Sequence, residues 1–143
     1  MIGSLRFRQS HVEEMRHHIE ACLPNEGCGL LAGTGNTVDR VLMISNQMQS
    51  PNRFRMDARE QLRGFHSIEE AGLELVGIFH SHPANTGSQA DQMPGPSVTD
   101  IREAAYPVVQ VIWFRQQGLW SARGFWIEDG NVRAVPLQIV AAE

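Results

Sequence analysis

The run Leu73–Phe79 constrains the fold most, because it is apolar over most of its length and ends at a polar segment. Such a run is typical of a strand that is buried on both faces in the middle of a sheet. Both faces of that sheet then need helices to cover them. Residues 10–23 repeat apolar side chains at helical spacing, residues 57–71 open with a helix-starting pattern, and a short helix is expected from Ser97 to about Tyr106. The chain is therefore predicted to be an α/β sandwich.

Five further segments have the composition of strands. The first two flank the turn Gly33-Thr34-Gly35-Asn36, which predicts a hairpin. The five segments are residues 28–32, 38–45, 108–114, 119–127 and 132–137. The predicted fold class is thus α/β, with a mixed β-sheet of about six strands flanked by helices.

Composition narrows the class of protein. The 143 residues are close to the roughly 150 of one domain, so residues 1–143 are predicted to form a single domain. The net charge of -4 lacks the basic excess of a nucleic-acid binder. No segment approaches the roughly 18 apolar residues of a membrane span, and two cysteines are too few for a disulfide scaffold. We expect a cytoplasmic protein with neither nucleic acid nor a membrane as partner.

Two histidines stand at the end of the run Leu73–Phe79. His80 and His82 are two positions apart, so on a strand their side chains point to the same face, about 6.6 Å apart along the chain. Two imidazoles in this arrangement can bind one ion, and zinc needs a third protein ligand. Asp100, in the first turn of the third helix, is the natural candidate. The alternative is that the histidines form a surface turn and that Ser97 and Asp100 only cap the helix.

Other polar residues stand next to predicted strands. Glu26 directly precedes the strand 28–32, where its carboxylate could face the end of the sheet, although it could equally be a loop glutamate. Asn46 and Ser50 follow the second strand and are candidates for the lining of a cleft. Cys28 lies two residues after Glu26; it is either a small buried apolar residue or a thiol facing the open position of a metal.

Three segments resemble the JAMM (MPN-plus) zinc metalloproteases. They are Glu26-Gly27-Cys28-Gly29-Leu30-Leu31-Ala32-Gly33, Gly77-Ile78-Phe79-His80-Ser81-His82-Pro83 and Pro96-Ser97-Val98-Thr99-Asp100. The family motif is a glutamate, then His-x-His-Pro, then Ser-x-x-Asp, and all of its positions are occupied in order. The resemblance covers nearly the whole chain and is greatest to the small stand-alone prokaryotic members. It implies the MPN/JAMM sandwich, which is similar to the cytidine-deaminase fold.

The resemblance also implies a role for each matched residue. His80, His82 and Asp100 would bind Zn²⁺, Glu26 would be the general base and proton shuttle, and Ser97 would donate a hydrogen bond to the developing oxyanion. These roles agree with general chemistry, because zinc lowers the pKa of water and a carboxylate can then take its proton.

One departure from the family pattern lies between His82 and Ser97. The fourteen residues 83–96 are about twice as many as the family places there, and they contain a second Ser-x-x-Asp, ending at Asp91. Asp100 is preferred over Asp91 because its motif matches as a block with the following helix. We expect residues 83–96 to be an exposed loop that recognises substrate; the alternative is an insertion without a role.

The resemblance implies an enzyme, a zinc metallopeptidase or isopeptidase. It would cleave the C-terminal tail or isopeptide linkage of a ubiquitin-like or sulfur-carrier protein, by Glu26-assisted attack of zinc-bound water, and it leaves a homodimer open. The alternative is a non-catalytic MPN scaffold that retains a structural zinc, against which the complete residue set argues. A zinc deaminase is excluded, because the patterns His-x-Glu and Pro-Cys-x-x-Cys are absent.

Overall fold

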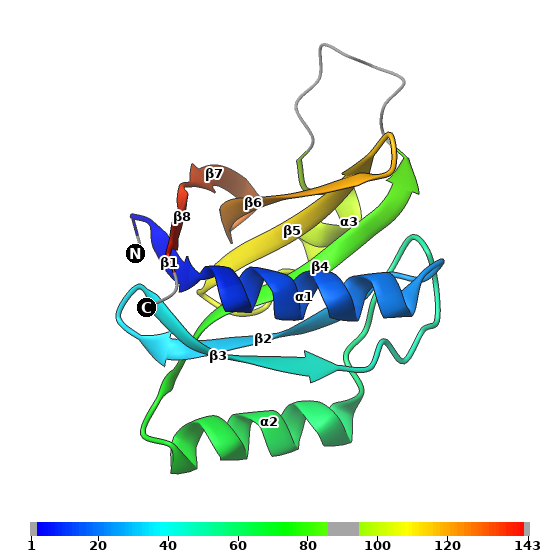
Figure 1. Ribbon diagram of the computed structural model, residues 1–143. Helices are drawn as coiled ribbons and strands as arrows, with labels where there is room; N and C mark the ends of the chain where they lie inside the picture. Colours follow the sequence, from blue (N-terminus) through cyan, green and yellow to red (C-terminus); the bar gives the residue numbers. More distant parts are fainter. Residues whose placement is uncertain (1–2, 86–94, 142–143) are drawn as a thin grey trace.

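The computed structural model describes residues 3–85 and 95–141. Within these residues the strands form one eight-stranded mixed sheet, in the order β7-β6-β5-β4-β2-β3-β1-β8 (Figure 1). The strands are β1 Leu5–Arg8, β2 Cys28–Thr34, β3 Thr37–Ile44, β4 Glu74–Asn85, β5 Val109–Gln116, β6 Leu119–Glu128, β7 Asn131–Val135 and β8 Leu137–Val140. The helices are α1 Gln9–Cys22, α2 Ala58–Glu70 and α3 Val98–Glu103.

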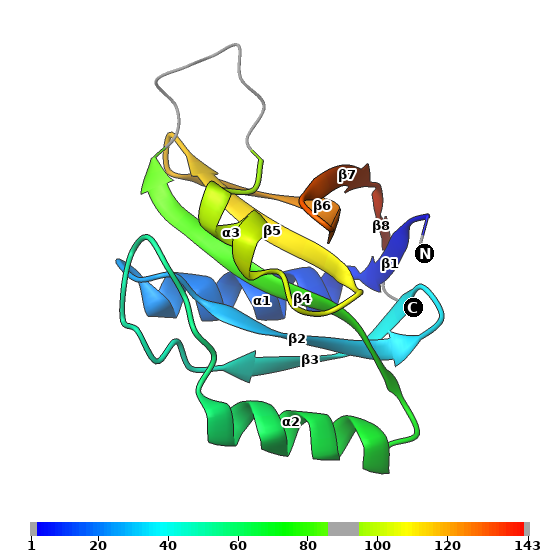
Figure 2. The same cartoon turned by 180° about the vertical axis from the view of Figure 1, so that it is seen from behind.

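The helices cover both faces of the sheet, as the apolar central strands require. The two views show α1 on one face and α3 on the other, with α2 below the sheet near β3 (Figure 1, Figure 2). Met15 and Ile19 of α1 pack with Phe79 and Trp113 in one core cluster. Ile68 of α2 packs with Leu30 of β2 and Ile78 of β4 in a second core cluster, on the opposite face of the sheet. The predicted α/β class with a helix-flanked mixed sheet is confirmed.

The sheet has eight strands and not about six. The short strand β1 was not predicted, because four residues give too little alternation to detect. The segment expected as one strand, residues 132–137, is interrupted at Pro136, which has no amide hydrogen for a ladder. The carbonyl of Pro136 instead accepts from the amide of Leu5, at 3.0 Å, and β8 then pairs in parallel with β1.

The strand β4 also continues further than expected. The exposed loop was expected to begin at Pro83, but β4 runs to Asn85 and Pro83 is buried. His80 lies opposite Cys28 of β2 and opposite Ile112 of β5, and His82 lies opposite Phe114. His80 therefore has ladder partners on both sides and His82 has one on the side of β5, so both lie within the strand, which removes the surface-turn alternative.

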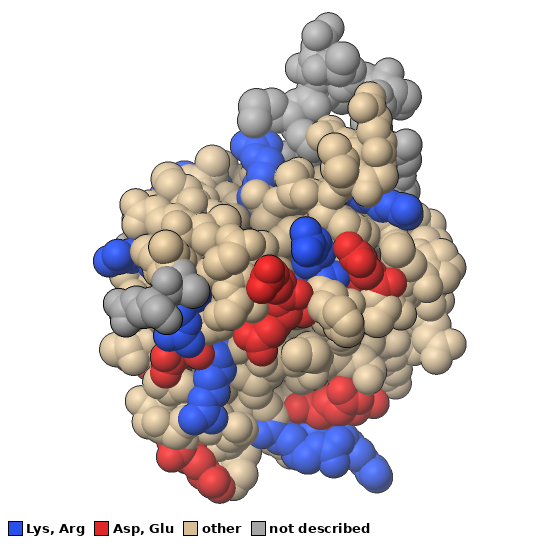
Figure 3. Space-filling model, in the orientation of Figure 1, with Lys and Arg blue, Asp and Glu red and all other residues tan. Residues whose placement is uncertain are grey.

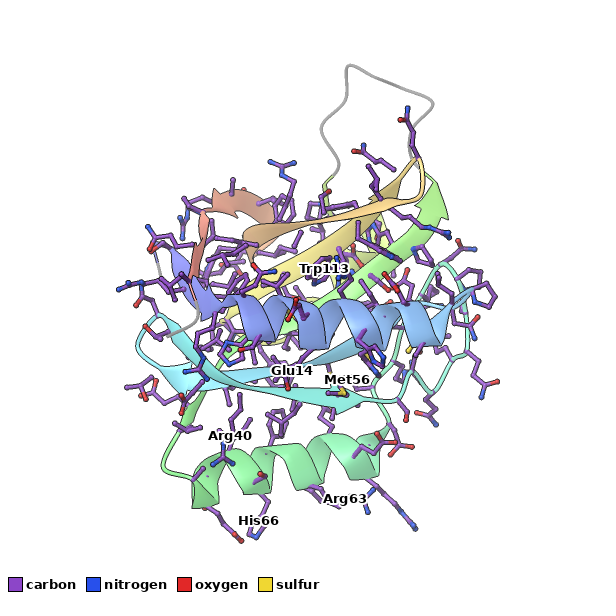
Figure 4. The ribbon with its side chains drawn as sticks, viewed as in Figure 1. Glu14, Arg40, Met56, Arg63, His66 and Trp113 are labelled. Carbon is purple, nitrogen blue, oxygen red and sulfur yellow. The ribbon has the colours of Figure 1, made fainter. Side chains whose placement is uncertain are left out.

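The side chains at the surface differ from those between the layers. Met56 belongs to the core cluster beneath α2, whereas Arg63 and His66 lie on the exposed side of that helix (Figure 4). Acidic and basic side chains are interspersed on the face that carries α1 (Figure 3). The 12 residues counted as Lys or Arg are all arginines, since the sequence contains no lysine.

Among the helices of residues 3–85 and 95–141, none has the length and the apolar character that a membrane crossing requires.

Candidate metal centre

Three side chains of ligand type meet at the carboxyl end of β4. His80 Nε2 lies 3.2 Å from His82 Nε2 and 3.2 Å from Asp100 Oδ1, and His82 Nε2 lies 2.9 Å from Asp100 Oδ2. A tetrahedral zinc ion with bonds of about 2.05 Å separates its ligand atoms by about 3.3 Å. The three side chains thus have the separation and chemistry that zinc requires. Within residues 3–85 and 95–141, no other group of three has this property.

Asp100 reaches the histidines from the first turn of α3. Ser97 caps that helix: its Oγ accepts from the Asp100 amide at 3.0 Å, and its own amide donates to Asp100 Oδ2 at 2.9 Å. The Asp100 carboxylate therefore takes part in the helix cap and contacts both histidines at the same time. Ile101 and Ala104 pack α3 against a core cluster on β5 and β6, which fixes the helix over the sheet.

The protonation states of these groups suit a metal ligand. Burial opposes ionisation of Asp100, but hydrogen bonds from His80 and His82 outweigh it and hold the pKa of the carboxyl well below its usual range. Burial lowers the pKa of His80, against the opposing effect of Asp100. A neutral imidazole and an ionised carboxylate are the forms that bind a metal.

Glu26 is buried beside this group but is not part of it. Its side chain is 3% exposed, and Oε1 has no hydrogen-bond partner among the described residues. Burial, with a smaller contribution from the Asp100 carboxylate, raises the pKa of Glu26 to about 8. The expectation that this carboxyl faces the end of the sheet agrees with its position, and such a pKa lets it both take and give a proton near neutral pH.

Cys28 belongs to the core and not to the metal centre. Its side chain is fully buried in the core cluster that contains Ile68 of α2. Its thiol donates to the carbonyl of Ile44 at 3.5 Å. Burial raises the pKa of this thiol to about 12, so it stays protonated. Of the two readings from the sequence, the small buried apolar residue is the one the structure supports.

A pocket of about 200 Å³ lies next to the metal centre, between residues 53–56 and α3. His80 and Asp100 form part of its wall. Gln110 on β5 also lines the pocket and is 7% exposed. Its side-chain amide makes no hydrogen bond within the described residues. An ion pair of 2.9 Å between Arg53 and Glu103 joins its two sides. The remaining lining residues are Phe54, Arg55, Met56, Gln61, Ile78, Thr99, Ala104, Ala105 and Tyr106.

Some of the residues around the candidate metal centre were not predicted from the sequence. Phe54 stacks on the His80 ring with centroids 4.5 Å apart, and nothing in the sequence indicated that contact. Gln110 could have been noticed as a polar residue within an otherwise apolar strand. Asn46 and Ser50, expected to line the cleft, instead bond to the backbone of Glu26. Asp91 and most of the expected loop lie outside the described residues.

Comparisons with known proteins give relatives over most of the chain. The family model described as prokaryotic homologs of the JAB domain matches residues 8–128. A desampylase of Pyrococcus furiosus is 48% identical over 116 residues, 80% of this chain and 75% of the relative. A CysO-cysteine peptidase of Mycobacterium tuberculosis is 31% identical over 140 residues, 95% of this chain and 91% of the relative. The solution structure of a Desulfitobacterium hafniense protein, 32% identical, matches with a TM-score of 0.82 and covers 96% of this chain and 94% of that one.

Proposed function

This chain belongs to the family of prokaryotic JAB-domain homologues, and from that premise we propose that it is a zinc-dependent peptidase or isopeptidase. Its substrate would be the C-terminal tail or isopeptide linkage of a ubiquitin-like or sulfur-carrier protein. The observation that carries the proposal is the meeting of His80, His82 and Asp100 beside the buried carboxyl of Glu26, whose Oε1 has no hydrogen-bond partner among the described residues.

His80, His82 and Asp100 would hold the metal. Bound there, zinc would polarise the scissile carbonyl and acidify the attacking water. Asp100 brings the negative charge, and its ionised state is maintained by the two histidines. Because the carboxylate also caps α3, its orientation is fixed before any ion arrives.

Glu26 would move the proton. Its carboxyl lies outside the set of three ligands, so it remains available to take a proton from water and to deliver it to the leaving amine. A general base of this kind contributes about 10²- to 10⁴-fold to a rate. The hydroxyl of Ser97 accepts one hydrogen bond in the cap, and its own hydrogen remains to be donated to the oxyanion.

The substrate class rests on the family resemblance and is supported by the relatives named a desampylase and a CysO-cysteine peptidase. The pocket beside His80 supports this proposal, because it adjoins the candidate ligands His80 and Asp100 and is lined by polar side chains such as Gln110. A tail bound there would present its last carbonyl to the metal centre.

The test uses two forms of one ubiquitin-like protein. In the first, its C-terminal glycine is joined to a free cysteine; in the second, to the lysine side chain of a peptide. We expect the zinc-loaded protein to release the intact carrier from at least one of them, as measured by mass spectrometry, and EDTA to stop the reaction. Full zinc occupancy without cleavage of either would favour the non-catalytic scaffold.

A further inference from the structure

The segment from Asn46 to Met56, which connects β3 to α2, is folded around one side chain. The Asn46 amide donates to the carbonyls of Glu26 and Arg53, each at 3.0 Å, and accepts from the amides of Met48 and Arg55, each at 3.0 Å. An asparagine side chain has two donor hydrogens and an oxygen with two acceptor sites. All of this capacity is used, so the side chain closes the segment onto itself and onto Glu26.

Glu26 depends on this segment for its backbone contacts. It precedes β2 and so lies outside the ladder of that strand. Its amide donates to the carbonyl of Ser50 at 2.8 Å, and its carbonyl accepts from Asn46. The next residue, Gly27, is held by Ser81, which accepts at Oγ from the Gly27 amide at 2.8 Å. Oε1 of Glu26 has no hydrogen-bond partner in the described chain, so the hydrogen bonds that hold this residue in place are those of its backbone.

The same segment also touches a candidate ligand. Phe54 stacks on the His80 ring at an angle of 24°. The Nδ1 atom of His80 is buried and has no hydrogen-bond partner within residues 3–85 and 95–141, so this stacking replaces the hydrogen bond that usually orients a ligating histidine. The Asn46 segment thus contacts Glu26 on one side and His80 on the other.

We propose that Asn46 is a positioning residue, whose amide locks the 46–56 segment to the backbone of Glu26 and so holds the Glu26 carboxyl toward the metal centre. The proposal rests on the proposed function, in which Glu26 transfers the proton. A displacement of about 1 Å in a reacting group can cost about 100-fold in rate. Loss of the tether should therefore reduce kcat more than it changes zinc binding.

Two variants separate the hydrogen bonds that the Asn46 side-chain amide donates from those that it accepts. Asn46→Asp keeps oxygen acceptors for Met48 and Arg55 but loses both donated bonds, including the one to Glu26. Asn46→Ala loses all four. We expect kcat to fall about 10- to 100-fold in both, with KM within about threefold of wild type in Asn46→Asp and a larger KM in Asn46→Ala, because the segment lines the pocket. Zinc affinity should change less than about twofold in Asn46→Asp.

A measurement on the metal-free protein keeps the test independent of activity. Hydrogen exchange of the Glu26 amide should accelerate at least about 10-fold in both variants, whereas exchange of Phe79 in the sheet should not change. Asn36→Asp is the matched control, since the Asn36 side-chain amide bonds to Ser4 and Thr37 near the opposite end of β3 and not to the 46–56 segment or to Glu26.

Three outcomes decide the proposal. A reduced kcat together with faster exchange at Glu26 supports it. Unchanged kcat, or a loss of kcat that follows loss of zinc, overturns it. If the wild-type protein cleaves neither conjugate, the proposed function fails, and unchanged exchange at Glu26 would then separately show that Asn46 does not hold this residue.

Discussion

At the scale of single residues, three titratable side chains lie buried or nearly buried in the candidate metal centre and beside it. Asp100 is ionised, His80 is neutral, and Glu26 keeps its proton well above the pH at which a carboxyl ordinarily loses it. Burying a carboxyl oxygen that has no hydrogen-bond partner, as Oε1 of Glu26 has none in the described chain, costs free energy that the surrounding fold must supply. Such a cost is typical of a site that is selected for chemistry.

Glu26 makes the stability of the metal-free protein depend on pH. The pKa of Glu26 is raised from 4.5 to about 8, so between these values the folded protein holds a proton that the unfolded chain has lost. The unfolded state then binds fewer protons, and stability falls as the pH rises from about 5 to 8. Glu26→Gln cannot titrate. In metal-free samples, the melting temperature of Glu26→Gln relative to that of the wild type should therefore increase as the pH rises from about 5 to 8.

The control for this measurement is Glu13→Gln, which replaces an exposed carboxylate on α1. A melting-temperature difference for Glu26→Gln that is constant from pH 5 to 8 would contradict a buried, protonated Glu26. The same variant should bind zinc normally and lose about 10²- to 10⁴-fold in kcat, because its amide cannot accept the proton.

The candidate ligands could be predicted from the sequence because the pattern is local. His80 and His82 need only a strand to share a face, and Ser97 with Asp100 needs only a helix start. The contributions of Asn46 and Phe54 could not be predicted, because they depend on the conformation of a segment without regular structure. No periodic pattern indicates that an asparagine side chain will bond to a residue 20 positions earlier.

At the scale of elements, α3 combines a structural and a chemical use of one carboxylate. Asp100→Asn keeps an oxygen that can accept from the Ser97 amide, whereas Asp100→Ala does not. We expect both variants to lose zinc affinity by at least about 100-fold, since each lacks the anionic ligand. The metal-free Asn variant should melt several degrees above the Ala variant, because a lost cap costs about 1 kcal/mol.

Asp91→Asn is the matched variant for this comparison, because Asp91 ends the competing Ser-x-x-Asp pattern in the sequence. It should retain one zinc per chain by metal analysis. Loss of zinc in Asp91→Asn, with zinc retained in Asp100→Asn, would show that the third ligand lies within residues 83–96.

The elements that the sequence did not predict are those with the fewest residues. The hairpin β2–β3 and the central strands have turns or apolar runs that identify them. The strands β1 and β8 have four residues each, and they pair with each other in parallel. That pairing joins the two ends of the chain, so a local pattern cannot reveal it.

At the scale of the whole molecule, the metal centre combines groups from distant parts of the chain. Glu26 precedes β2, the histidines lie in β4, and Asp100 lies in α3, after residues 86–94. Because α3 has its own packing through Ile101 and Ala104 and an ion pair between Glu103 and Arg53, its position should not depend on the connecting residues.

Replacing residues 86–94 by two glycines tests this independence. We expect one zinc per chain to remain, and KM to rise for a protein conjugate while staying within about twofold for a short peptide. Loss of zinc, or an equal rise in KM for both substrates, would show that the connection helps to build the centre. An unchanged KM for both would leave the connection without a role in recognition.

The positive charge of this protein is carried entirely by guanidinium groups. An isopeptide bond forms on the ε-amino group of a lysine, and a guanidinium, which stays protonated in proteins, is not an acceptor under the same conditions. None of the 143 residues therefore offers a side-chain amine to a ubiquitin-like modifier. This chain would therefore not carry such a modifier through an isopeptide bond on its own side chains, and every lysine-linked conjugate in a mixture with it would belong to another protein.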